Sequence, residues 1–186
     1  MIKEKVLENK ENLLQALSTT KAKYVIGTML LTGIGIALPR IFHVLAGSDA
    51  GATFLPMHIA VLIATLTFGI TSSTIVAGGS VIGSYLLTGM PSLVRLPYML
   101  MELVIYAVLL SICSKRFNLY ISLALTIVLG RILYAGVLAV AINILGLPTY
   151  GISVIESIKI GLPGIILQLA FIPVMAKTIQ KGIRLD

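Results

Sequence analysis

The chain has 186 residues, of which 58% are hydrophobic and only 11% are charged. An average soluble domain carries about 25% charged residues, so this composition excludes an ordinary soluble domain and predicts an integral membrane protein. The apolar runs are continuous, unlike the alternating segments of about ten residues that build a membrane β-barrel. Because a spanning helix needs about 20 apolar residues, we expect one all-α bundle with at most six or seven spans.

The first 22 residues differ from the remainder because they are rich in charge. Their apolar residues are spaced three and four apart, which predicts a short amphipathic helix at the membrane surface. They lack the basic, apolar and small-residue order of a secretory signal peptide. We therefore divide the chain into a cytoplasmic amphipathic segment, residues 1–22, and a single transmembrane domain, residues 23–186.

Six apolar stretches follow, and each predicts a spanning helix. We expect a kink in the first at Pro39, because proline removes a backbone donor and crowds the preceding turn. The second and third are short for spans, whereas the fifth is the longest and is expected to tilt. The predicted spans cover residues 24–45, 54–70, 74–88, 97–113, 119–145 and 160–178.

Three segments rich in glycine, proline and polar residues interrupt these stretches, at residues 36–57, 88–96 and 146–159. The first, together with His58 that follows it, contains both histidines of the chain, an arginine and an aspartate. Non-helical backbone near membrane depth persists only where protein buries it or where it lines a cavity. This segment is therefore the first candidate for a binding site.

Ten of the 14 Lys and Arg residues fall on one side of the six predicted spans. These ten are Lys3, Lys5, Lys10, Lys21, Lys23, Lys115, Arg116, Lys177, Lys181 and Arg184. Cytoplasmic segments are enriched in Lys and Arg, so both termini are predicted to be cytoplasmic and the three interrupting segments to lie outside. Topology and attraction to anionic lipid explain the net charge of +7, and a nucleic-acid partner is not expected.

Glu102 and Arg131 are strongly ionisable side chains well inside predicted spans, where a charge is costly. Counting 1.5 Å per residue from the span ends places both in the outer half of the bilayer at similar depth. We expect them to face each other or a shared polar cavity. A structural ion pair joining two helices and direct contact with a ligand are both open.

Histidines and aromatic residues gather around the same outer half. His58 follows the proline that opens the second span, and a second imidazole at His43 could also bind a heteroaromatic ligand, although loop backbone could equally satisfy it. A transition-metal site usually needs more converging ligands, so no metal is expected. Pockets are mostly apolar and aromatic, although tyrosines also gather at membrane interfaces. The candidate substrate-binding residues are His43, Phe54, Met57, His58, Tyr98, Met99, Glu102, Arg131 and Tyr134.

Gly33 and Ala37 in the first span form a small-xxx-small face, which is typical of close helix packing within a bundle or against a partner. No nucleophile, zinc or nucleotide-binding motif such as G-x-S-x-G, H-E-x-x-H or G-x-x-x-x-G-K-[ST] occurs. We therefore expect a protein that is not an enzyme and carries no cofactor.

With these residues in view, the chain resembles the substrate-binding S components of energy-coupling factor (ECF) transporters, the ABC-type importers that bring vitamins into bacteria. The resemblance covers residues 27–145 and lies in short strings: LPRIFH, FLPMHIAVL, TGMP, the ME of MELVIYA and the GR of VLGRILYAG. It implies a six-helix bundle in the bacterial cytoplasmic membrane that holds its ligand near the outer face. It also implies docking through Gly33 and Ala37 onto a T subunit, although this family's pattern is usually rich in alanine.

The resemblance implies that two ATPase subunits complete the transporter, so that ATP is used by the partners only. The loaded S component would topple in the membrane and release its ligand inward. Small heteroaromatic B vitamins or precursors, pyridoxine-like or niacin-like, rank first as substrates, while cobalamin, pantothenate and queuosine precursors are open. The alternative is a proton-coupled secondary carrier with Glu102 as its proton site, a class usually built from two related halves, which the sequence does not display.

Overall fold

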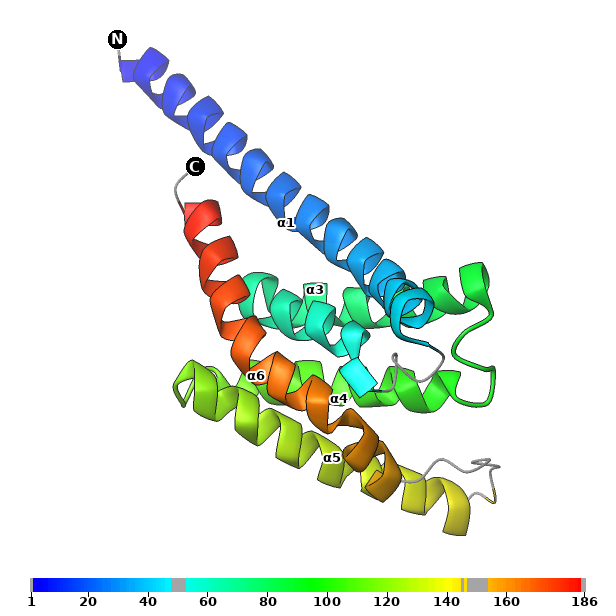
Figure 1. Cartoon of the computed structure of the whole chain (residues 1–186). Helices are drawn as coiled ribbons and strands as arrows, with labels where there is room; N and C mark the ends of the chain where they lie inside the picture. Colours follow the sequence, from blue (N-terminus) through cyan, green and yellow to red (C-terminus); the bar gives the residue numbers. More distant parts are fainter. Residues whose placement is uncertain (1, 48–52, 145, 147–153, 185–186) are drawn as a thin grey trace.

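The computed structural model describes residues 2–47, 53–144, 146 and 154–184. The long helices in these residues are α1 (Ile2–Ala46), α3 (Pro56–Thr88), α4 (Leu96–Cys113), α5 (Leu119–Asn143) and α6 (Val154–Arg184) (Figure 1). Each of the five contains a stretch long and apolar enough to cross a membrane. By helix length and hydropathy, this is a multi-pass, all-helical membrane protein.

Helix α3 contains a reversal of the chain at Gly69. The backbone there is non-helical, with φ 84° and ψ −175°, a conformation that glycine adopts at little cost. A Cβ added to Gly35 of α1 would meet both Ala60 and Ser80, which a straight helix would separate by about 30 Å. The two arms of α3, residues 56–68 and 70–88, therefore lie side by side and run in opposite directions, as Figure 1 shows.

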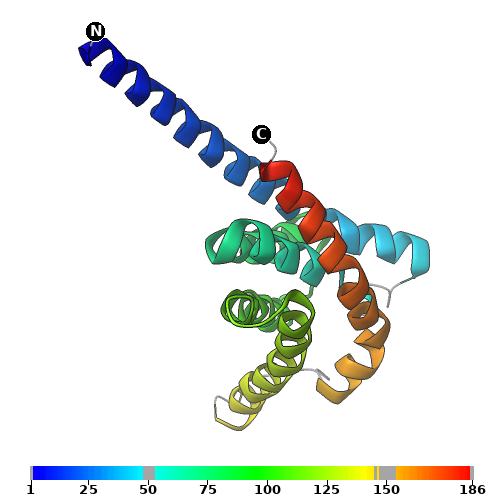
Figure 2. The same ribbon diagram turned by 90° about the vertical axis from the view of Figure 1, so that its left-hand side faces the viewer.

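Helix α1 is longer than the predicted first span. It runs without a break for 45 residues and contains Pro39 in its interior, so the segment predicted to be non-helical from residue 36 is helical up to Ala46. The division expected at residue 22 is likewise not marked by a break in the helix. In both views of the ribbon, the N-terminal end of α1 points away from the other helices (Figures 1 and 2).

Helices α4 and α5 follow the predicted spans closely, and α6 begins earlier than expected, at Val154. Two local features set these starts: Pro97 occupies the first turn of α4, and the Asn118 side chain accepts a hydrogen bond of 2.9 Å from the Ile121 backbone N–H to cap α5. The segment predicted to be non-helical at 88–96 does contain a break before α4. Residues 147–153 of the predicted segment 146–159 lie outside the described residues, and residues 154–159 belong to α6.

Small residues bring α1 against both arms of α3. Gly79 lies against Thr32 and Gly83 against Ile36, and Gly27 accommodates the ring of Phe68. Without a hydrophobic driving force between helices in lipid, such close approach is how dispersion holds them together. The resulting contact explains why the third predicted span is rich in glycine and serine.

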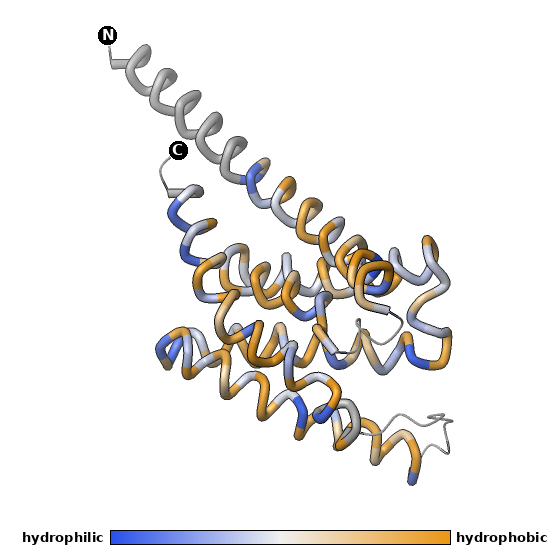
Figure 3. Tube along the Cα trace, viewed as in Figure 1, coloured by the Kyte–Doolittle hydropathy of each residue, from blue (hydrophilic) through white to orange (hydrophobic). Residues whose placement is uncertain are grey.

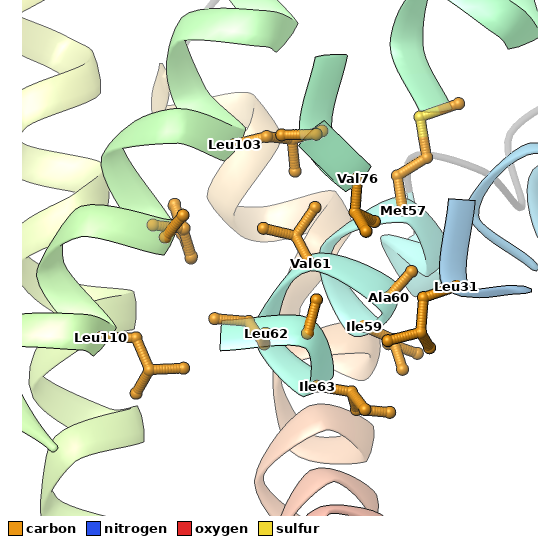
Figure 4. Packing of buried hydrophobic residues seen from close by; sticks show 14 of the residues in the cluster. Leu31, Met57, Ile59, Ala60, Val61, Leu62, Ile63, Val76, Leu103 and Leu110 are labelled. Carbon is orange, nitrogen blue, oxygen red and sulfur yellow. The ribbon is translucent and has the colours of Figure 1, made fainter. Parts of the chain in front are cut away.

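The interior of the bundle contains polar side chains as well as apolar ones, and its surface is apolar. Val61, Leu62, Leu103 and Leu110 are fully buried between α3 and α4, and Figure 4 shows these side chains converging. The exposed side chains of the same helices are largely Leu, Ile and Val, and Figure 3 shows the apolar character along the helices. An apolar exterior of this extent is typical of a surface that faces lipid.

Candidate functional site

A buried cluster of polar side chains joins three helices near one end of the bundle. Arg131 of α5 donates from Nη1 to Oε1 of Glu102 of α4 across 2.7 Å, and both residues are at least nine-tenths buried. The prediction that these two residues face each other is confirmed. His58 of α3 places Nε2 3.5 Å from the same carboxylate oxygen, which is longer than an ordinary N–H···O hydrogen bond.

An aromatic ring forms one wall of this cluster. Tyr106 lies one helical turn after Glu102, and its ring contacts the His58 imidazole edge to face with a centroid separation of 5.0 Å. A Cβ added to Gly130 would come within 2.7 Å of the Tyr106 ring, so glycine at position 130 allows α5 to approach α4. The glycine beside Arg131 therefore brings its guanidinium within reach of Glu102.

The chain turns sharply just before His58. Leu55 has φ 49° and ψ 48°, a left-handed conformation that costs a non-glycine residue about 1–2 kcal/mol. Pro56 then starts α3, and the Leu55 carbonyl accepts a 3.0 Å hydrogen bond from the His58 backbone N–H. Strain of this kind persists where the surroundings impose it, and it is often found at functional sites.

Helix α6 closes the cluster on another side through two glycines. A Cβ added to Gly161 would lie 3.1 Å from Leu55 Cδ1 and 3.6 Å from Arg131 Nη2. At Gly164 the added atom would meet backbone atoms of residues 53 and 54 at 2.6 to 2.8 Å. Further along the same buried face lies Gln168, which is only 1% exposed.

No protein-family model, no curated protein and no solved structure matches this chain. The interpretation of the cluster therefore depends on the chemistry of its own residues.

Seven of the nine predicted substrate-binding residues fall into three groups. His58, Glu102 and Arg131 are brought together in the buried cluster. Met57 is buried in the main apolar core and Met99 packs against that core, so both support the cluster's surroundings. Tyr98 and Tyr134 form a second small buried group with Leu138 and Ala141, on the same helices as Glu102 and Arg131.

Among the described residues, His43 and Phe54 form no hydrogen bond, ion pair or ring contact with the charged residues of the cluster. His43 is half-buried in the last turn of α1. Phe54 is half-buried just before α3, and its ring packs on Phe42 with a centroid separation of 4.9 Å. The ring contact of Phe42 with Phe54 joins the end of α1 to the start of α3, and the place of His43 and Phe54 in a ligand site stays a prediction.

From the sequence, Tyr106 is expected among the aromatic residues of the outer half but not among the substrate-binding residues, and Thr126 and Gln168 are not singled out. Tyr106 is spaced four residues from Glu102, and that spacing on one helix face favours its place in the site. Thr126 and Gln168 are polar residues inside apolar stretches, and both are buried. In the described part of the chain, no group of three or more His, Cys, Asp or Glu side chains is placed to hold a metal ion.

Proposed function

We propose that the protein is the substrate-binding S component of an ECF-type importer in a bacterial cytoplasmic membrane, and that it binds a small vitamin or vitamin precursor. The observation that carries this proposal is the buried cluster of His58, Glu102 and Arg131, drawn from three helices. Ionisable residues inside a membrane domain are costly and usually serve a substrate or ion pathway. The resemblance of the sequence strings around these three residues to S components supports the same assignment.

In the proposed architecture, each of the two arms of α3 is one membrane crossing. If each arm crosses the bilayer, the bundle has six crossings and both termini lie on the same side. Lys21, Lys115 and Lys177 then share that side, which the enrichment of Lys and Arg in cytoplasmic segments makes the cytoplasm. His58 and Glu102 lie in the first two turns of α3 and α4 and Arg131 lies at the middle of α5, so the cluster lies in the outer half of the bundle.

Transport in this proposal follows from differential affinity. The cluster binds the substrate from outside, and the T subunit with two ATPase subunits drives the loaded protein to an inward-facing orientation. Because a ligand shifts an equilibrium only by its difference in affinity for two states, the inward orientation must bind the substrate more weakly. Disturbing the contacts of α6 with Arg131 and the chain at residues 53–55 is one way to obtain that difference.

Mass spectrometry of small molecules that co-purify with the detergent-solubilised protein tests this function. We expect one vitamin-like compound near one molecule per protein, favouring pyridoxine-like or niacin-like compounds, and a rise in Tm when it is added back. An empty preparation whose Tm does not shift with any of a panel of vitamins would contradict the proposal.

A proton-coupled secondary carrier is the second candidate, favoured by one observation. The buried Glu102 carboxylate lies beside a titratable imidazole, His58, and buried carboxylates next to histidines can relay protons in transporters. Uptake by the isolated protein in liposomes, driven by a pH gradient without ATPase subunits, would favour this candidate over an S component.

The exposed face of α1 suits the docking of a partner subunit. Gly33 has no atom within 4 Å of an added Cβ, and Ala37 is also exposed, whereas Gly35 on the opposite face packs on α3. Small residues on a lipid-facing helix allow another helix to approach closely. The face that Gly33 and Ala37 share is therefore the proposed contact with the T subunit.

Gly33→Leu should abolish uptake in cells that express the complete transporter while leaving substrate affinity unchanged, because the leucine obstructs docking and lies far from the buried cluster. The matched control is Gly136→Leu on α5, which is equally exposed and open and should change neither property. Normal uptake by the Gly33→Leu protein would remove the docking proposal.

A further inference from the structure

The fixed charges of the buried cluster cancel each other. Glu102 and Arg131 are 7% and 6% exposed and form one close ion pair. Arg40, Arg95 and Lys159, the described cations on neighbouring segments, are exposed and are largely screened by water. An anion that drew Arg131 away from Glu102 would leave a carboxylate buried without its cation, which is strongly unfavourable.

Two further polar side chains add hydrogen-bonding capacity beside this pair. His58 is 2% exposed and Gln168 is 1% exposed. Among the described residues, neither His58 Nδ1 nor Gln168 Nε2 has a hydrogen-bond partner. Since buried polar groups in proteins are nearly always hydrogen-bonded, both atoms call for a polar partner.

Contacts at two points place Gln168 beside the start of α3, between the levels of residue 54 and His58. Gly164 lies against the backbone of residues 53 and 54, and Gln180 Nε2 donates to the Leu66 carbonyl across 2.6 Å. Helix α6 therefore runs parallel to the first arm of α3. Gln168 is four residues beyond Gly164, about 6 Å along the axis, and His58 is four residues beyond position 54.

The direction of helical side chains brings the amide still nearer the ion pair. Long side chains on an α-helix point back toward its N-terminus. From Gln168 this direction leads toward Gly161, where an added Cβ would lie 3.6 Å from Arg131 Nη2. Gly161 and Gly164 have no side chains, so neither position places an atom group between the Gln168 amide and the cluster.

We propose that the site takes a small polar molecule with no net charge, such as a hydroxylated or amide-bearing heterocycle, and that His58 and Gln168 hydrogen-bond its uncharged groups. This inference rests on the proposed function, because it names the substrate class of the same site. Among the compounds considered above, it favours pyridoxine-like molecules and amides over nicotinate, pantothenate and phosphorylated forms. Gln168 becomes a specificity-determining residue supplied by α6.

Matched pairs of probes that differ in charge test the substrate class. We expect nicotinamide to raise the Tm more than nicotinate, or pyridoxine more than pyridoxine 5′-phosphate, and the co-purified compound to be neutral or zwitterionic at pH 7. Glu102→Gln should move the preference toward the anionic member of the pair by at least tenfold, because it leaves the charge of Arg131 without its carboxylate. A stoichiometric anionic ligand in the unaltered protein would overturn this inference while leaving the proposed function in place.

The role of Gln168 is tested by comparing it with the other glutamine of α6. Gln168→Leu should weaken binding of the co-purified compound at least tenfold without lowering the Tm of the ligand-free protein, because it removes a buried amide that lacks a partner. Gln180→Leu, which loses the hydrogen bond to Leu66, should lower the Tm and leave the affinity unchanged. If the Gln168→Leu protein and the unaltered protein bind the compound with equal affinity, the role of Gln168 is refuted. If the unaltered protein binds no probe and no co-purified compound, the proposed function is refuted and this inference with it.

Discussion

Arg131→Met should lower the free energy of unfolding by about 3–5 kcal/mol and abolish binding of the co-purified ligand. The methionine removes the cation from a buried pair and leaves the Glu102 carboxylate beside His58 alone, which is the costly way to break such a pair. Denaturant unfolding in detergent measures the first effect, and a binding isotherm for the co-purified compound measures the second.

The double substitution Glu102→Gln with Arg131→Met separates the structural role of the pair from its role in binding. Replacing both partners by neutral side chains of similar size is often nearly neutral for stability, so most of the lost stability should return. Binding should stay lost, because neither the Arg131 guanidinium nor the Glu102 carboxylate is left to complete the polar cluster around the ligand. Full recovery of binding in the double variant would make the pair a structural device that only joins α4 to α5.

Charge within apolar sequence was the feature that made the pair predictable. A carboxylate and a guanidinium at matched depth on consecutive spans have few alternatives to each other in lipid, because each needs an opposite charge. The positions of Glu102 and Arg131 along their predicted spans were therefore enough to predict the pair, and the 2.7 Å contact confirms it. His58 was placed near them by a similar argument, from the proline that starts its helix.

The extent of α1 and the contribution of α6 were harder to predict. Pro39 signals a break in isolated sequence, yet α1 continues through it to Ala46, because apolar neighbours on both sides favour helix in a membrane and proline is tolerated there more readily than in water. Gln168 carries no local signal beyond its polarity. Its importance depends on which helix α6 packs against, and that is set by long-range contacts such as Gln180 with Leu66.

The reversal at Gly69 illustrates both sides of this problem. The break between the second and third predicted spans was readable from the sequence, because Thr71, Ser72 and Ser73 separate two apolar runs. The backbone is nevertheless helical on both sides of Gly69, from Pro56 to Thr88. Contacts of α1 with both arms, such as those of Gly35, reveal that the chain doubles back, and such contacts are tertiary information.

Gly164→Ala should destabilise the protein by about 1–3 kcal/mol or more, the usual range for an overpacked site, and should also weaken ligand binding. The added methyl group would lie 2.6 Å from the Thr53 carbonyl oxygen and 2.7 Å from the Phe54 carbonyl carbon. Because these are backbone atoms that cannot rotate away, α6 itself must move. That movement displaces Gln168 from its place beside the start of α3 and Gly161 from Arg131, so the loss of stability and the loss of affinity have one cause.

Two other glycine substitutions show whether this effect is specific to close packing. Gly136→Ala places a methyl group in open space on α5 and should be neutral or stabilising, since alanine favours helix over glycine by up to about 1 kcal/mol. Gly161→Ala meets the flexible end of Leu55 at 3.1 Å, which can shift, so its effect on Tm should be smaller than that of Gly164→Ala. If Gly164→Ala proved as harmless as Gly136→Ala in both Tm and affinity, α6 would not be held against the start of α3, and the placement of Gln168 beside the ion pair would fail with it.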